Sequence, residues 1–70
     1  VVENVCAWWP GSDPELAREA ILVSAHYDHV GARGEEIYNG ADDNGSGTCG
    51  LLALAEALAS YGPLRRSVLL

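Results

Sequence analysis

The clearest pattern of apolar positions lies in the second half of the chain. There, apolar residues follow the spacing i, i+3, i+4, i+7 at Leu51, Leu54, Ala55 and Leu58. This spacing places them on one face of an α-helix. Ser46 precedes the pattern as the expected N-cap, and Gly62 with Pro63 supplies the stop signals after it. The sequence therefore predicts one amphipathic helix in this region.

Shorter apolar runs predict strands. Val1–Trp9 is rich in β-branched and aromatic residues, and Ala20–Ala25 is a nearly continuous apolar run typical of a buried strand. Ser67–Leu70 reads as the beginning of a third strand. Pro14–Arg18 suits a single helical turn with proline near its start, and Val30–Asn39 is expected to be a loop.

The order strand, strand, loop, helix, strand predicts an α/β fold, in which helices pack on a sheet. The chain shows no internal repeat and no linker, so residues 1–70 are expected to lie within one domain. It ends in the apolar run at Leu70. An exposed apolar strand at the end of a domain would be a sticky edge. We therefore expect the chain to be an incomplete part of a larger domain, truncated after its first strands and helix.

Composition narrows the classes of partner. Of the 70 residues 49% are hydrophobic, which suits a globular core, and the net charge is −6. All four basic residues are arginines. This balance disfavours nucleic acid and anionic membranes as partners, and no apolar run approaches the length of a membrane span. Cys6 and Cys49 lie far apart, so they are expected to be two small buried residues, although the sequence also allows a disulfide.

The run Ala20–Ala25 leads directly into His26, Tyr27, Asp28 and His29. On an extended segment, side chains two apart point the same way, so His26 and Asp28 share a face and His29 points away from them. Both residues of this pair could bind one metal, or the imidazole could bind while the carboxylate holds its other ring nitrogen. A core histidine beside a surface aspartate is the plainer alternative.

The stretch GADDNGSGT, Gly40–Thr48, places two adjacent carboxylates in a glycine-rich turn. Asp42 and Asp43 repel each other unless a positive group lies near, and a cation is the natural partner. A solvated turn before a helix remains the alternative, since Asp, Asn, Gly and Ser are common turn residues.

The sequence of this stretch does not match two other types of ligand-binding loop. A calcium EF-hand beginning at Asp42 would need glutamate at its twelfth position, which is Ala53. A phosphate-binding loop would need the motif GxxxxGK[ST] or GxGxxG. This loop instead carries two acidic residues, which repel phosphate, and no lysine.

Together, AHYDHVG and YNGADDNGSGT resemble metallopeptidase family twenty-eight, the di-zinc aminopeptidase-like family of clan MH. The stretch NVCAWWPGSDP, the Leu/Ala helix and RRSVLL are similar to the family pattern in the same order, so the resemblance covers nearly the whole chain. It implies a zinc-dependent exopeptidase-like fold with a mixed β-sheet and packed helices. Residues 1–70 would be part of the catalytic domain of a hydrolase that cleaves peptide substrates, most often from the amino end.

The resemblance also implies roles for single residues. His26 matches a histidine that binds one zinc, and Asp43 matches the carboxylate that bridges two zinc ions. Asp28 matches the catalytic aspartate that orients the histidine. Tyr27 and His29 match positions that are not ligands, and the peptide bond after Asp43 is often cis in the family.

The family's general-base glutamate, the adjacent ligand and two later ligands match no position in this chain. The remainder of the catalytic domain is therefore an implied partner, and the 70-residue chain alone is expected to be inactive. A non-catalytic receptor or scaffold-like relative, or a structural remnant, is the rival interpretation. Only the usual location of members of this family suggests that the protein is secreted or periplasmic.

Overall fold

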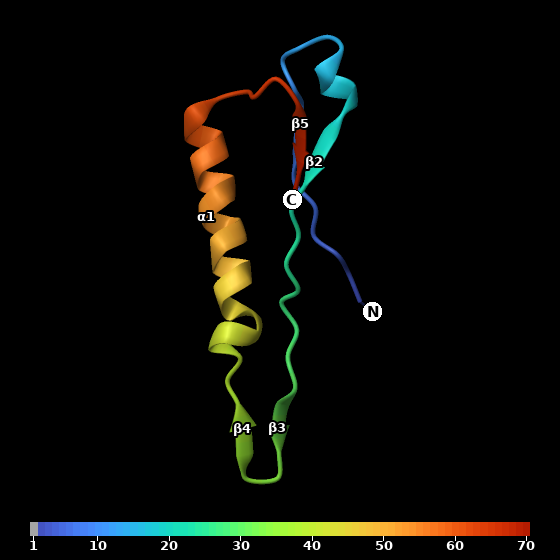
Figure 1. Ribbon diagram of the computed structural model, residues 1–70. Helices are drawn as coiled ribbons and strands as arrows, with labels where there is room; N and C mark the ends of the chain where they lie inside the picture. The colour runs from blue at the N-terminus through green and yellow to red at the C-terminus, as the bar shows by residue number, and fades with distance from the viewer. Residues whose placement is uncertain (1) are drawn as a thin grey trace.

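A computed structural model describes residues 2–70, and Figure 1 shows their arrangement. The molecule is elongated, with extents of 55 × 25 × 15 Å. In chain order its elements are β1 (Trp8–Trp9), the 3₁₀ turn η1 (Leu16–Arg18), β2 (Ala20–Leu22), β3 (Gly31–Arg33), β4 (Glu36–Tyr38), the π-turn η2 (Ala41–Gly45), α1 (Ser46–Tyr61) and β5 (Ser67–Leu69).

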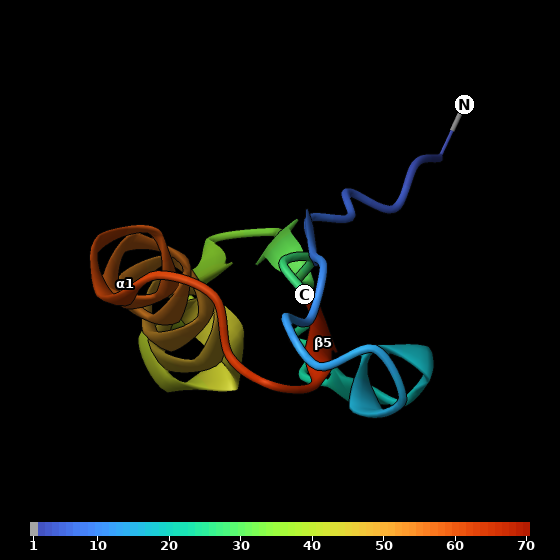
Figure 2. The same cartoon turned by 90° about the horizontal axis from the view of Figure 1, so that it is seen from above.

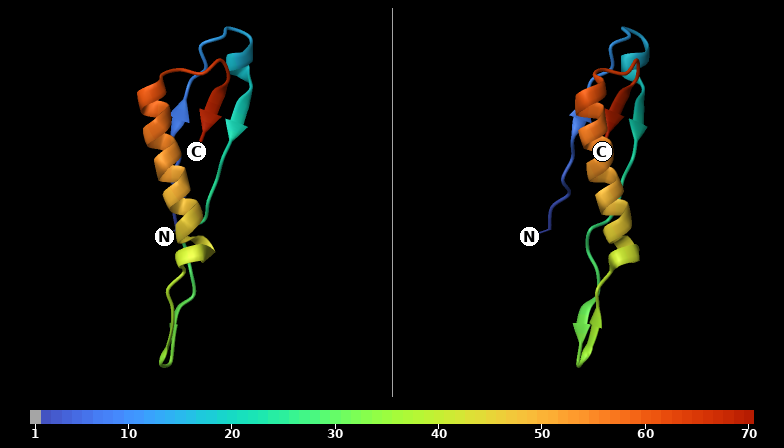
Figure 3. Two further views of the ribbon diagram at one scale, coloured as in Figure 1. Left: turned by 60° about the vertical axis from the view of Figure 1, so that its left-hand side comes forward. Right: turned by 90° about the vertical axis from the view of Figure 1, so that its left-hand side faces the viewer.

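A three-stranded sheet occupies one end of the molecule, with the strand order β1-β5-β2 (Figure 3). β5 pairs antiparallel with β1 and parallel with β2, so the sheet is mixed. The last strand of the chain is therefore central, with Val68 and Leu70 buried. Both neighbouring positions of β5 are filled from earlier parts of the chain.

The helix α1 lies along one side of the sheet, as the view from above in Figure 2 shows. Leu58 of α1 is buried with Val68 and Leu70, and Trp9 and Leu54 are among the partly buried residues around them. The helical spacing predicted from the sequence thus supplies the face that packs on β5. A mixed sheet with a helix packed on it is an α/β fold, as predicted.

The first two strands are shorter than predicted. Of the expected strand Val1–Trp9, only Trp8–Trp9 forms β1, and Val1 lies outside the described residues. Of Ala20–Ala25, only the first three residues form β2, and all three are exposed, with Leu22 at 67%. The expectation of a buried strand was wrong, because β2 is an edge strand and α1 covers the central β5.

The segment Val30–Asn39, expected to be a loop, is a hairpin of β3 and β4 that projects from the body (Figure 1). Arg33 pairs with Glu36 across a two-residue turn that begins with Gly34. Gly34 has φ +63°, and glycine in the first turn position is a hairpin signal. The loop interpretation overlooked this signal.

The helix ends as predicted and begins differently. Gly62 follows α1 with φ +99°, and its N–H donates to the carbonyl of Leu58. Ser46 is the first residue of α1 and not its N-cap. Its hydroxyl donates to the carbonyl of Asp42 at 2.9 Å. The chain enters α1 through η2, in which Asp43 and Asn44 have non-helical backbone angles.

Two further expectations concern membranes and thiols. Among residues 2–70, no helix has the length and apolarity needed to cross a bilayer. Cys6 and Cys49 are both free and exposed. The expectation that they are buried was wrong, because the small core around β5 includes neither residue.

Asp13 connects the turn η1 to the segment that precedes β5. Its carboxylate accepts hydrogen bonds from the N–H groups of Leu16 and Glu15 at 2.9 Å, and Arg65 lies 3.2 Å away. These three contacts lower the pKa of Asp13 below its ordinary value of 3.8. The N–H of Leu16 has the largest effect, followed by the N–H of Glu15 and then by Arg65. Each of these contacts favours the ionised carboxylate.

This lowered pKa predicts a pH-dependent contribution to stability. A carboxylate with a depressed pKa in the folded state stabilises above its unfolded pKa, and the contribution is lost as pH falls through the folded pKa. Asp13→Asn is therefore expected to cause a small decrease in Tm at neutral pH, and the decrease should vanish well below pH 3.8. Thermal melts across this pH range measure the effect.

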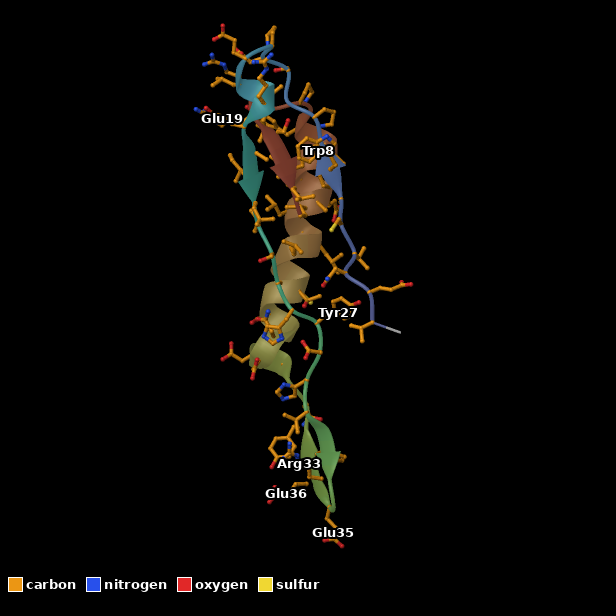
Figure 4. All side chains as sticks on the ribbon, turned by 90° about the vertical axis from the view of Figure 1, so that its right-hand side faces the viewer. Trp8, Glu19, Tyr27, Arg33, Glu35 and Glu36 are labelled. Atoms are coloured by element: carbon orange, nitrogen blue, oxygen red, sulfur yellow. The ribbon has the colours of Figure 1, made fainter. Side chains whose placement is uncertain are left out.

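Glu35→Gln is the matched control, since it removes one carboxylate at the exposed hairpin tip (Figure 4). A pH-independent difference between wild type and Asp13→Asn would contradict the electrostatic explanation.

Candidate metal centre

The segment between β2 and β3 brings His26 beside the beginning of α1. The carbonyl of His26 accepts hydrogen bonds from the side-chain amide of Asn44 at 3.2 Å and from the hydroxyl of Thr48 at 3.0 Å. Asn44 belongs to η2 and Thr48 to α1. These two bonds hold the backbone of His26 against the turn that carries Asp43.

The imidazole of His26 lies between two carboxylates. Its Nδ1 is 3.2 Å from both Oδ1 and the backbone carbonyl of Asp28, and its Nε2 is 3.3 Å from Oδ1 of Asp43. Two acceptors beside Nδ1 favour the tautomer with the proton on that nitrogen. This tautomer leaves the lone pair of Nε2 directed to the side where Asp43 lies.

The turn η2 sets the position of Asp43. It begins after Gly40, which has φ +70°, and the N–H of Gly45 donates to the carbonyl of Gly40 at 2.8 Å. The peptide bond Asp43–Asn44 is cis, as the family resemblance implied. The turn thus brings Asp43 to His26, while the carbonyl of the neighbouring Asp42 bonds to Ser46.

His29 lies where the sequence did not predict it. Strand alternation would turn His29 away from His26, but its Nδ1 is 3.8 Å from Oδ2 of Asp43. The alternation fails because residues 23–30 form no regular strand. The His29 ring also lies against Gly40, where the added Cβ of any other residue would meet it, and no pattern in the sequence indicated this contact.

Tyr27 points to the other side of the segment. Its hydroxyl donates to the carbonyl of Glu3 at 3.1 Å, and Figure 4 shows it on the side of the N-terminal segment. A hollow lined by residues 2–4 and 25–28 opens beside His26 and Asp28. Tyr27 therefore helps to form a wall next to the candidate centre.

Two donor atoms in this group suit a metal ion. Two ligands bound at ~2.0–2.1 Å to one tetrahedral zinc ion lie roughly 3.3 Å apart. The separation of 3.3 Å between Nε2 of His26 and Oδ1 of Asp43 agrees with this value. Both side chains are more than half exposed, so further ligands have room to approach. Within residues 2–70, however, no group of three or more His, Cys, Asp or Glu residues could hold a metal ion.

The candidate centre lies beyond the carboxyl end of β2, which is where ligands bind in open α/β sheets. The model of peptidase family M28 matches residues 4–70 of the chain. The chain therefore belongs to peptidase family M28, a family of metallopeptidases. No curated protein and no solved structure matches it significantly.

Proposed function

We propose that this chain is the N-terminal part of the catalytic domain of a zinc-dependent aminopeptidase. The observation that carries the proposal is the 3.3 Å approach of His26 Nε2 to Asp43 Oδ1, with Asp28 on the opposite ring nitrogen. Membership of a metallopeptidase family supports a metal at this position. Zinc suits the mixed nitrogen and oxygen donors.

In this proposal, His26 and Asp43 would hold zinc in a site that takes up two ions. Zinc supplies Lewis acidity, which activates a water molecule and polarises the carbonyl group of a peptide bond. In this role, the carboxylate of Asp28 accepts a hydrogen bond from the Nδ1–H group of His26 and so keeps Nε2 free for the metal. The general-base glutamate and the remaining ligands would come from the rest of the catalytic domain, so the 70-residue chain alone would be inactive.

The test is hydrolysis of an aminoacyl anilide by the full-length protein. Activity should disappear after chelation and return with zinc, and an N-acetylated substrate should resist cleavage if a free amino terminus is required. Hydrolysis only at the carboxyl end, or cyclisation of N-terminal glutamine, would replace the aminopeptidase assignment. Absence of metal-dependent chemistry would favour a non-catalytic receptor or scaffold-like role. Strong zinc-dependent hydrolysis by the isolated 70-residue chain would contradict the division of the site.

The variant Asp28→Asn tests whether Asp28 orients the ring of His26. The amide can present its NH₂ to Nδ1 of His26 and favour the wrong tautomer. Loss of the hydrogen-bond partner of a metal-binding histidine typically lowers metal affinity or activity about 10- to 100-fold. We therefore expect kcat of Asp28→Asn to fall by about that factor while much of the zinc remains bound. Zinc stoichiometry and kcat are the two measurements.

Asp42→Asn is the matched control for this variant. It makes the same change of side chain in the turn η2, where Asp42 accepts the hydrogen bond of Ser46 through its backbone carbonyl. Full activity of Asp28→Asn would remove the proposed role of Asp28.

A further inference from the structure

His29 is the most enclosed side chain in the candidate metal centre. Its side chain is 24% exposed, compared with 54% for His26 and 74% for Asp43. The ring lies against Gly40, where an added Cβ would be 2.8 Å from Cδ2 and 2.9 Å from Cγ of His29. The ring thus occupies the space that glycine leaves open, and packing limits where it can move.

The carboxylate of Asp43 lies between two imidazoles. Oδ1 is 3.3 Å from Nε2 of His26, and Oδ2 is 3.8 Å from Nδ1 of His29. The 3.8 Å between His29 and Asp43 is longer than a direct hydrogen bond. It is also longer than the roughly 3.3 Å that separates two ligands of one tetrahedral zinc ion. Hydrogen bonds at active sites are often long before the site is filled.

We propose that His29 is a positioning residue for Asp43. Its ring, held against Gly40, keeps a protonated Nδ1 beside Oδ2 and so fixes which way the carboxylate turns toward His26. His29 acts through Asp43 and binds no metal itself. The importance of this role for hydrolysis rests on the proposed function, whereas the contact itself does not.

The first test is the tautomer of His29 in the metal-free full-length protein, labelled with ¹⁵N-histidine and studied by NMR at a pH where imidazoles are neutral. The signals of His29 are assigned by their loss in His29→Asn. We expect the Nδ1–H tautomer to dominate, and Asp43→Asn to shift His29 toward the Nε2–H form that a free histidine side chain prefers. A dominant Nε2–H form that does not respond to Asp43→Asn would overturn the proposal.

The second test compares three substitutions by zinc content and kinetics. Asn places an amide NH₂ near the former Nδ1, Gln places it farther out, and Leu fills the space without a donor. We expect kcat/KM to fall about 10-fold or more in His29→Leu and His29→Gln and to stay within about threefold in His29→Asn. Zinc content should remain at the wild-type level in His29→Asn.

These outcomes separate the two proposals. Loss of zinc from His29→Asn, with its fold intact by circular dichroism, would make His29 a ligand and overturn the positioning role. Equal activity of His29→Leu and wild type would also overturn it. If wild type shows no metal-dependent hydrolysis, the proposed function fails, and the NMR result alone then decides whether His29 orients Asp43.

Discussion

Asp43→Ala is expected to abolish metal-dependent hydrolysis by the full-length protein and to remove most of its zinc. Asp43 reaches toward His26 with one oxygen and toward His29 with the other, so a single truncation removes the group at the middle of the centre. If Asp43 bridges two ions, both lose a ligand at once. Zinc content after dialysis and kcat/KM on an aminoacyl anilide measure the effect.

His26→Ala should give the same loss, since it removes the other donor of the pair. Residues that act as one unit give strongly non-additive effects. The double variant should therefore be no worse than either single variant. Asp42→Ala is the matched control, because it removes the neighbouring carboxylate from the same turn and should retain zinc. Wild-type zinc content in Asp43→Ala would contradict the assignment of Asp43 as a ligand.

Gly40→Ala is expected to disrupt the centre without touching any proposed ligand. Gly40 has φ +70°, and a Cβ there would lie 2.8 Å from the ring of His29 and 2.9 Å from the carbonyl oxygen of Asp43. The left-handed backbone alone costs roughly 1–2 kcal/mol for an L-residue. The crowding adds to this cost and moves either His29 or the turn that carries Asp43. We expect lower zinc affinity and at least a tenfold loss of activity, because small displacements at a catalytic site have large effects.

Gly34→Ala separates the two contributions. Gly34 has φ +63°, but a Cβ there would meet nothing within 4 Å. The control variant therefore carries the backbone cost without the crowding, and it should lower Tm while leaving zinc affinity unchanged. Equal losses of zinc affinity in both variants would show that the contact between Gly40 and His29 is unimportant.

Local patterns predicted the fold where neighbours in sequence also decide the structure. The helix α1 was predicted because Leu51 to Leu58 repeat at the helical period, and Gly62 ends it with φ +99°. The hairpin of β3 and β4 was missed because its strands are only three residues long and contain no apolar run. Its signal was one glycine, Gly34, at the first position of a two-residue turn.

Motifs in the sequence were enough to predict which residues form the candidate centre. Its motifs supplied His26, Asp28 and Asp43, and the family resemblance implied which of them would bind zinc. The expected proximity of His26 and Asp28 is also present, with Nδ1 of His26 3.2 Å from Oδ1 of Asp28. These features depend on the type of each residue and on its spacing from near neighbours in the sequence.

The remaining contacts depend on how distant segments of the chain are arranged in three dimensions. It placed β5 in the centre of the sheet, left β2 exposed at the edge, and brought His29 beside Asp43. Each of these outcomes depends on which distant segments pair or pack together. Alternation in a single strand gave the wrong side for His29, because the segment leaves the sheet after β2 and its direction is then set by hydrogen bonds to Asn44 and Thr48.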